Sequence, residues 1–461
     1  MSLTRGPSLE DGARTAKTGA RLLPEAAVFL VLVIVALPIL SRGFPISPID
    51  EHAHLDYVLK AGQLQLPADD ELLGQETLRI MACTRMDSPA YVSPCELDVF
   101  LPEVFPDYGF NTASEAQPTF YLATGLLARA LRIFTPIDDL LFSARLANWV
   151  WTAAAGTLVF AAVRRRSTPM VVGGALATLL VLNPVAIAAG THVSPDSQLP
   201  LAGLTLFLLA RRPTTRPLRI ITLTAATAVL VSIDGAMGLA LILAGAVVGS
   251  QWLSGALAYR RRGASGRPTE LLSPTLRLGA LAIGGITGPA IIAMLRRWYS
   301  GSVGTRYTAL PRDEWFPRPP FSLEMVLSGF WNSFPPVGGG YLVPPLRGLE
   351  YAALTEVLGV LVIGGVVGFL LSTPSTDSQG EALAIATVGV FAFPILTVLL
   401  WSRGGSFWTL SPRFAIAPLA VYVVVTGLAA RSRVSQVVIV MLAASILALY
   451  LHETISFPTP S

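Results

Sequence analysis

EAAVFLVLVIVALPILSR, residues 25–42, is the stretch that decides the fold of this chain. Its charged residues stand only at its two ends, and it is long enough to cross the hydrocarbon core of a bilayer. The basic residues before it, among them Arg14, Lys17 and Arg21, predict a cytoplasmic N-terminus. The run is long for a signal peptide, and residues 41–44 make a poor cleavage site, so we expect a retained first membrane span.

The composition of the whole chain is that of a membrane protein. Of its 461 residues, 52% are hydrophobic and 13% are charged, and the mean hydropathy is +0.60. Soluble proteins carry about 25% charged residues. The pI near 9.2 suggests nucleic-acid binding at first sight, but the basic residues stand beside apolar runs, where they anchor loops in the cytoplasm. We therefore expect a multi-pass membrane protein with membrane lipids around it and no nucleic-acid partner.

Hydropathy and the placement of arginine predict an all-α protein with about eleven transmembrane helices. The clusters at 164–166 and 260–262 then fall in cytoplasmic loops, whereas Arg296 and Arg297 go against the rule. The predicted parts are a cytoplasmic tail (1–24), a membrane domain (25–430), and a last span with an outer tail (431–461). The predicted spans are 25–42, 142–163, 169–189, 197–210, 219–232, 236–254, 277–295, 351–371, 383–401, 413–430 and 434–451.

Two long loops are predicted on the outer face, at residues 44–141 and 297–350. The first holds 15 acidic and 5 basic residues, and the second is rich in aromatic residues, proline and glycine. Residues 118–134 could form one more span, but the segment is short, and Arg129 and Arg132 lie one helical turn apart. We therefore expect an amphipathic juxtamembrane helix there. Loops of this length are usually functional.

The chain has two cysteines, Cys83 and Cys95, and both lie in the first outer loop. Disulfides form in oxidising compartments, and the outer face of a plasma membrane is one. The sequence therefore predicts a bridge between them, with two unpaired thiols as the alternative.

The first candidate site directly follows the first span. Asp50, Glu51 and His54 come after Pro48, which favours a helix start. Spacings of three and four residues place side chains on one helix face, so the three can converge. One carboxylate could accept a proton from an incoming hydroxyl, or the cluster could hold a divalent cation such as Mg²⁺ or Mn²⁺. The alternative is that Asp50 only caps the helix; His52 points elsewhere and is expected at an interface.

Two more acidic residues are candidates. Asp196 follows His192 in the loop between the third and fourth spans, on the same predicted membrane face as Asp50. This placement favours a functional role for Asp196, with simple solvation at a span end as the alternative. Asp234 stands in Ser-Ile-Asp-Gly between two short spans, where Asp-Gly is a common turn pair, so a turn is the favoured interpretation.

Arg413 begins the tenth predicted span from the outer face, within Ser-Pro-Arg-Phe. An arginine there breaks the positive-inside pattern. A guanidinium at the level of the lipid headgroups is suited to a phosphate, which it can bind through two parallel hydrogen bonds. Snorkelling of the side chain to the interface is the alternative.

In their order and topology these features resemble the membrane-embedded C-type glycosyltransferase superfamily, which includes protein O-mannosyltransferases, oligosaccharyltransferases and lipid A aminoarabinose transferases. The resemblance covers roughly residues 25–430. Two positions depart from the pattern: Asp234 stands where many relatives carry a lysine, and Ser411-Pro412 replaces the commoner small residue before Arg-Tyr. The matching motifs are Asp50-Glu51, Gln117-Pro118-Thr-Phe-Tyr, Ala144-Arg145-Leu146-Ala-Asn148, Pro195-Asp196 and Arg413-Phe414.

The resemblance implies a plasma-membrane enzyme whose active site faces outward. It would transfer a sugar from a polyprenyl-phosphate donor to a glycan, lipid or protein acceptor, with no nucleotide or redox cofactor. Deprotonation of the acceptor during a single displacement gives inversion at the sugar. The expected site residues are Asp50, Glu51 and Asp196 for catalysis, Arg413 for the donor phosphate, His54, His192 and Asp234 in support, and Asp50, Asp196 and His54 as candidate metal ligands.

Two other functions remain open from the sequence. A transporter or flippase of lipid-linked sugars is expected to show repeats and broken helices with polar residues near the midplane. The short fifth and sixth spans around Asp234 fit this pattern, although no repeat is detectable. A non-catalytic scaffold for a cell-envelope complex needs only the topology.

Overall fold

The computed structural model of this chain is helical. In the described residues it contains no β-strand, and one isolated bridge joins Leu72 and Phe110. The residues described are 9–47, 50–68, 71–84, 93–114, 116–165, 168–261, 269–299, 321–324, 326–327, 349–372, 376–402 and 415–456. The α-helices are α1 (Leu9–Leu40), α2 (Glu51–Gly62), α3 (Gln75–Thr84), α4 (Pro118–Phe134), α5 (Leu140–Arg164), α6 (Met170–Val181), α7 (Pro184–Thr191), α8 (Leu199–Arg211), α9 (Pro217–Val231), α10 (Met237–Arg261), α11 (Thr269–Tyr299), α14 (Leu349–Ser372), α15 (Thr376–Ser402), α16 (Ile416–Ala429) and α17 (Arg433–Ser456).

Six of the described helices contain a stretch that is long and apolar enough to cross a membrane. A seventh span arises if α6 and α7, which are bent by 65° relative to each other, cross together. The break has a local cause, because Pro184 lacks an N–H and the Asn183 side chain accepts from Val185 N to start a new helix. This is the pattern of a multi-pass membrane protein. The six stretches are Leu23–Leu40, Leu140–Arg164, Met237–Arg261, Leu271–Leu295, Gln379–Val398 and Arg433–Ser456.

Every one of the eleven predicted spans overlaps a described helix, but the count of eleven is not established. The apolar helices Pro217–Val231, Glu356–Ser372 and Ile416–Ala429 are shorter than the six long stretches. Of these, α16 is buried along almost its whole length, because it packs against α5, α8 and α14. By length and composition the described part of the chain therefore has six or seven spans, and eleven remains a prediction.

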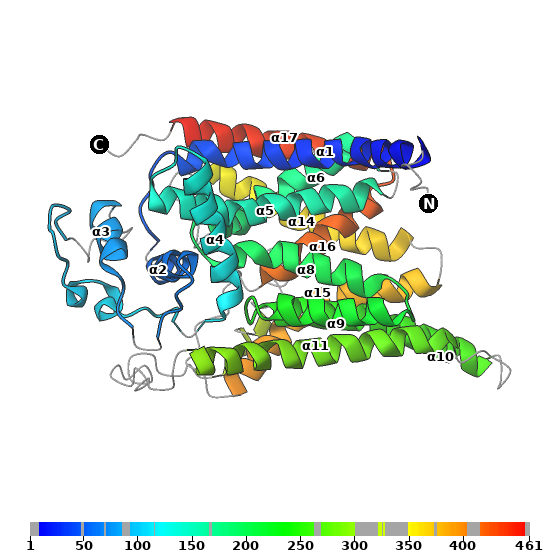
Figure 1. Cartoon of the computed structure of the whole chain (residues 1–461). Helices are drawn as coiled ribbons and strands as arrows, with labels where there is room; N and C mark the ends of the chain where they lie inside the picture. Colours follow the sequence, from blue (N-terminus) through cyan, green and yellow to red (C-terminus); the bar gives the residue numbers. More distant parts are fainter. Residues whose placement is uncertain are drawn as a thin grey trace, which may run out of the picture.

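Helix α5 lies in the middle of the bundle (Figure 1) and packs against α1, α4, α6, α8 and α16. Of its apolar, membrane-length stretch, 67% is buried inside the protein.

Glycine allows the close approach of other helix pairs, as in membrane proteins generally. A Cβ on Gly203 of α8 would meet the carbonyl oxygen of Ala417 in α16, and one on Gly288 of α11 would meet that of Ala228 in α9.

Helices α2, α3 and α4 cover one end of the bundle, which we call the α2 end (Figure 1). Helix α4 has the predicted bounds, 118–134. It runs across the ends of the long helices in Figure 1 and is not among the described helices that could span a membrane. It crosses α2 at Gly62 and Gly125, where an added Cβ would lie 2.8 Å or less from the partner backbone. This tight crossing fixes the relative positions of the side chains on both helices.

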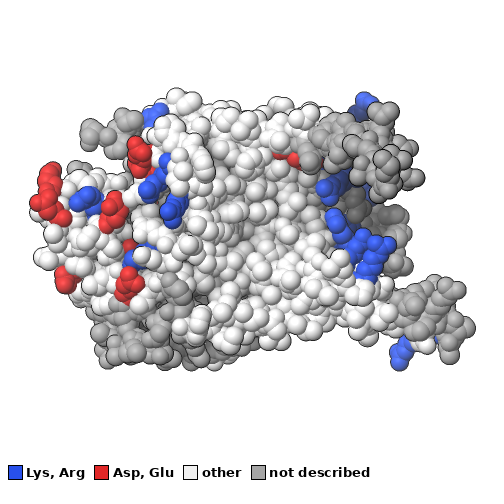
Figure 2. Space-filling view, viewed as in Figure 1, with Lys and Arg blue, Asp and Glu red and all other residues white. Residues whose placement is uncertain are grey.

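Charge divides the two ends of the molecule. Acidic side chains gather at the α2 end, whereas the opposite end is mainly basic (Figure 2). The arginines of that opposite end stand where α5, α8 and α10 finish, at Arg164, Arg211 and Arg261. We call it the arginine end.

A buried carboxylate and a disulfide organise the loop around α3. Asp56 of α2 accepts hydrogen bonds from Gly74 N (2.8 Å), Thr77 Oγ1 (3.0 Å) and Asn111 Nδ2 (2.8 Å), and it pairs with Lys60 Nζ at 2.8 Å. A buried carboxylate needs such partners, so Asp56 ties this loop to α2. 

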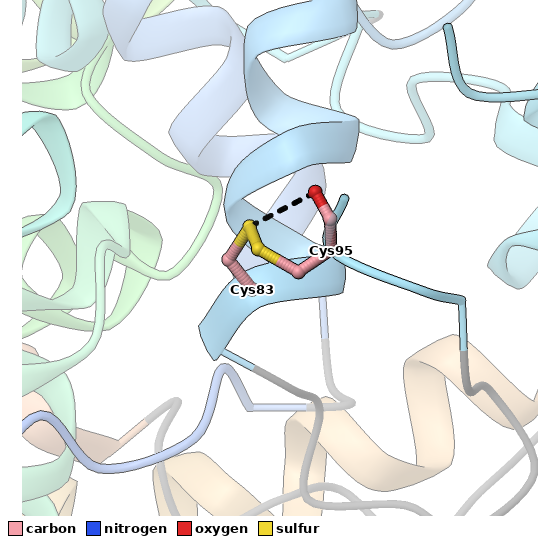
Figure 3. The surroundings of a disulfide bond; sticks show 2 residues. All are labelled: Cys83 and Cys95. Atoms are coloured by element: carbon pink, nitrogen blue, oxygen red, sulfur yellow. Dashed lines mark hydrogen bonds between the residues drawn. A yellow bond between two sulfur atoms is a disulfide. The ribbon is translucent and has the colours of Figure 1, made fainter. Parts of the chain in front are cut away.

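Cys83, near the end of α3, is bonded to Cys95 (Figure 3). Their Cα atoms lie 4.7 Å apart. The bridged sulfur of Cys83 carries no proton, so its 3.8 Å approach to the Cys95 carbonyl oxygen in Figure 3 is a packing contact.

Candidate functional site

Glu51, the first residue of α2, is buried with 1% of its surface exposed. Its carboxylate forms a two-pronged ion pair with Arg145 of α5, with Nε–Oε1 at 2.9 Å and Nη2–Oε2 at 3.0 Å. The backbone N–H groups of Ser47 and Val193 donate to it as well, at 2.8 and 3.1 Å. Burial raises the pKa of Glu51, but the charges of Arg145 and His192 and the hydrogen bonds from Arg145 and Ser47 outweigh burial, so the pKa lies below its ordinary value.

Arg145 has further partners besides Glu51. Its Nη1 donates to Phe44 O at 2.9 Å and its Nη2 to Pro45 O at 3.1 Å, and its guanidinium lies 3.9 Å from the centroid of the Phe44 ring. Arg145 thus fixes both the segment between α1 and α2 and the start of α2. The Glu51 carboxylate accepts four hydrogen bonds and four N–H groups of Arg145 have acceptors in the fold, so the pair of Glu51 and Arg145, which we call the anchor, supports the structure.

Asn148 lies one turn beyond Arg145 on α5 and holds the loop that carries Asp196. Its Nδ2 donates to the carbonyl oxygens of Ala189 and His192, both at 2.6 Å, and its Oδ1 accepts from Ser197 Oγ at 2.7 Å. Asp196 lies in the short 3-10 helix Pro195–Gln198 and is buried. The loop is therefore a rigid part of the α2 end.

Asp50 stands directly before α2 and differs sharply from its neighbour. Its backbone is left-handed, with φ 61° and ψ −4°. Such conformations cost on the order of 1–3 kcal/mol in general, although aspartate adopts them more readily than most residues, and they cluster at functional sites. The half-buried side chain does not cap α2, and no described residue donates a hydrogen bond to its carboxylate. The structure therefore does not show the helix cap that was the alternative role of Asp50.

His54 contacts Tyr121 of α4, whereas Glu51 pairs with Arg145 of α5. Nδ1 of His54 lies 2.7 Å from the hydroxyl oxygen of Tyr121, which is fully buried. The ring of Tyr121 stacks on that of Tyr57, with centroids 3.8 Å apart and planes at 5°. Helical spacing places Glu51 and His54 near each other on α2, but each side chain has its partner on a different neighbouring helix.

Three of the predicted acidic residues lie within electrostatic reach of Tyr121. Burial is the largest cause that raises the pKa of Tyr121 well above its ordinary value. The neighbouring Tyr57 raises it further, and so do three carboxylates, those of Asp234, Asp196 and Asp50. These carboxylates come from three separate segments, yet all lie within electrostatic reach of one hydroxyl group. The phenol stays protonated, so it can donate a hydrogen bond to His54.

Asp234 has the turn role that its Asp-Gly pair indicated. Its Oδ1 accepts from Ala236 N at 2.7 Å, which forms an Asx turn before α10. Ser232 Oγ lies 3.2 Å from Thr119 Oγ1, and this contact joins the end of α9 to the start of α4. A turn role and a place beside Tyr121 are therefore compatible. We call Asp50, His54, Tyr121, Asp196 and Asp234 the acidic cluster.

His192 and the candidate metal ligands are further predicted residues of the site. His192 lies beside the anchor, with Nε2 4.0 Å from Glu51 Oε2 and Nδ1 3.1 Å from Ala188 O. Within the described residues, no three His, Cys, Asp or Glu side chains form a group that could hold a metal ion. Asp50, Asp196 and His54 thus do not form such a group, and the divalent cation remains a prediction.

Several predicted features lie outside the described residues. They include Arg413, the predicted ligand of the donor phosphate, and most of the loop 297–350. The phosphate-binding role of Arg413 therefore stays a prediction.

Two residues carry structural roles that the sequence did not assign. Arg145 and Asn148 stand three residues apart at the start of an apolar helix, where a charged and an amide side chain indicate internal pairing, though not with which partner. Tyr121 belongs to the motif Gln117-Pro118-Thr-Phe-Tyr, but the sequence assigned it no role.

A polar cleft of about 700 Å³ is lined by residues of α2, α3, α4 and the start of α5. Its lining includes Lys60, Gln75, Arg129 and Arg132, and none of the predicted site residues. The cleft is therefore lined by the later turns of α2, whereas Asp50 stands directly before this helix.

No protein-family model matches the chain, and no curated protein is similar to it at a significant level. The link to C-type glycosyltransferases thus remains a resemblance carried by the motifs, and the function has to be inferred from the site.

Proposed function

We propose that this protein is an integral-membrane glycosyltransferase that takes a sugar from a polyprenyl-phosphate donor. The observation that supports this most is the acidic cluster at the α2 end. Asp50 offers a half-buried carboxylate in a strained backbone conformation, and no described residue donates to it. Titratable side chains that gather at one place from separate segments of a chain are typical of functional sites.

The proposal includes eleven spans and a fixed orientation in the plasma membrane. The N-terminus and the arginine end lie in the cytoplasm, and the α2 end lies outside. The unequal charge of the two ends supports this orientation, because basic residues favour the cytoplasmic side (Figure 2). The bridge between Cys83 and Cys95 agrees with an oxidising compartment at the α2 end.

The proposed chemistry is a single displacement. Asp50 accepts the proton of the acceptor hydroxyl as its oxygen bonds to the anomeric carbon, and the bond from that carbon to the phosphate oxygen breaks. The lipid phosphate leaves with the electron pair of that bond, and the sugar inverts. Arg413 is the proposed group that offsets the phosphate charge.

The remaining residues have supporting roles in this proposal. We assign Glu51 to the anchor, because its carboxylate already has four donors. Asp196 is the second acidic residue of the site, and the hydrogen bond between His54 and Tyr121 keeps these two side chains in position. The acceptor is a glycan, a lipid or a protein hydroxyl.

Turnover of a radiolabelled polyprenyl-phosphate sugar by purified protein, with cell-envelope extract as acceptor, tests the proposal. Asp50→Asn should lower turnover by about 10²-fold or more, the effect of losing a general base. Asp98→Asn is the matched control, since Asp98 is an exposed carboxylate of the same loop, and it should not change turnover. Near-normal turnover by a folded Asp50→Asn protein would overturn the role of Asp50. EDTA in the same assay tests the predicted cation.

A transporter of lipid-linked sugars is the second candidate, because the 65° break between α6 and α7 is a feature of transporters. Proteoliposomes with donor but no acceptor separate the two functions. A transporter moves the intact donor across the bilayer, whereas a glycosyltransferase leaves it in place until acceptor is added. A scaffold does neither.

A further inference from the structure

A cavity of about 340 Å³ lies at the arginine end, between α5, α8, α10 and α16. Its rim is basic, and one wall is apolar and only half-buried. The rim is formed by Arg165, Arg211 and Arg212, and the wall by Leu158, Leu208 and Leu428.

The rim carries an excess of positive charge. Arg211 pairs with Glu381 of α15 at 2.7 Å, whereas Arg165 and Arg212 have no ion pair with any described residue. A further arginine, the buried Arg277, lies next to the cavity and contacts its lining. It donates to Ala210 O at 2.7 Å and to Oε1 of the lining residue Gln251 at 2.9 Å. A ligand in this cavity therefore meets exposed guanidinium groups that the protein does not neutralise.

The combination of a basic rim and an apolar wall selects an amphipathic anion. Arginine binds phosphate through two parallel hydrogen bonds, and basic pockets between membrane helices suit anionic lipid headgroups. A soluble phosphate would leave the leucine wall in contact with water, and a zwitterionic lipid would gain less from the uncompensated arginines.

We propose that this cavity binds an anionic phospholipid from the leaflet at the arginine end. The phosphate lies between Arg165 and Arg212, and an acyl chain packs against the leucine wall. The bound lipid connects α5, α8 and α16, so it stabilises the bundle at the end away from the acidic cluster. This inference is independent of the proposed glycosyltransferase function.

The test titrates purified, detergent-solubilised full-length protein with dioleoyl phosphatidylglycerol or dioleoyl phosphatidylcholine, followed by native mass spectrometry and thermal unfolding. Phosphatidylglycerol should bind more tightly and raise the Tm. The double variant R165Q/R212Q should bind it more weakly by about 5-fold for each arginine removed, on the order of 25-fold in all. The matched control is R260Q/R261Q, which removes the same charge from the end of α10, outside the cavity lining.

Three results would overturn the proposal. The first is that the control variant R260Q/R261Q binds phosphatidylglycerol as weakly as R165Q/R212Q does. The second is that R165Q/R212Q binds this lipid with unchanged affinity. The third is that an equal concentration of glycerol 3-phosphate displaces the lipid, which would show that the site recognises a soluble phosphate. Should R165Q/R212Q fail to fold, Ala162→Phe is the second probe. It narrows the cavity while every arginine is kept, and wild-type lipid affinity in that variant would also contradict the proposal.

Discussion

The anchor and the acidic cluster begin at neighbouring residues, yet they use their carboxylates in opposite ways. Glu51 is buried and accepts four hydrogen bonds, two of them from Arg145. Asp50 is half-buried, strained at φ 61°, and accepts none from any described residue. A carboxylate whose hydrogen bonds the fold supplies stabilises the fold, whereas one that accepts none from the described residues is available to a substrate. Proximity in the sequence therefore does not make two acidic residues a functional pair.

Loss of the arginine of the anchor should have the largest effect on stability. Arg145→Met leaves the Glu51 charge buried without its partner, which should lower the free energy of unfolding by about 3–5 kcal/mol. Denaturant titration in detergent measures the change. Arg132→Met, which removes an exposed arginine, is the control and should stay within about 0.5 kcal/mol of wild type. An Arg145→Met protein as stable as this control would show that the anchor is not structural.

The anchor should also give stability a pH dependence of known sign. The pKa of Glu51 is below its ordinary value of 4.5 in the folded protein. The stability it contributes is therefore fully present above pH 4.5 and is lost as the pH falls through the folded pKa. Unfolding curves of wild type and Glu51→Gln should differ at pH 7 and converge in acid. Curves that stay equally far apart below pH 4 would contradict the ionised pair.

The disulfide belongs to neither the anchor nor the cluster, so its removal should affect the loop alone. Replacing Cys83 and Cys95 with serine should destabilise the folded loop by about 2–4 kcal/mol, because the bridge limits the unfolded chain. Limited proteolysis measures this as faster cleavage near α3, with sugar transfer unchanged. Two free thiols in non-reducing peptide maps of exported protein would show that the bridge does not form.

Within the acidic cluster, Tyr121→Phe should have the smallest effect. It removes the hydrogen bond to His54 but keeps the stacking on Tyr57. We expect a loss of about 0.5–1.5 kcal/mol in unfolding free energy, the usual value of one hydrogen bond. A loss as large as that of Arg145→Met would place Tyr121 with the structural anchor.

Much of the fold follows from local patterns in the sequence. Each span that hydropathy predicts overlaps a helix of the structure. The segment predicted to be helical from Pro118 to residue 134 is α4, with the same bounds. The 65° break before Pro184 was not predicted, although Asn183-Pro184 is a turn signal inside the predicted span 169–189. Short buried helices such as α16 are below the length that identifies a membrane span by hydropathy.

The site was less predictable because its decisive contacts are distant in sequence. Glu51 and Arg145 are 94 residues apart, and His54 and Tyr121 are 67 apart. Helical spacing predicts which side chains share a face of α2, but not which neighbouring helix each one meets. The left-handed backbone of Asp50 has no signal in the sequence either, since aspartate also serves as an ordinary cap.

Sugar transfer and unfolding, measured side by side for Asp50→Asn and Glu51→Gln, test the central claim most directly. Both substitutions remove one charge and nearly preserve shape, and they differ by one position in the chain. The account predicts that Asp50→Asn keeps wild-type stability and loses turnover by about 10²-fold or more. Glu51→Gln should lose stability while its folded fraction still turns over the donor. A stable, inactive Glu51→Gln protein beside an active Asp50→Asn protein would contradict the account.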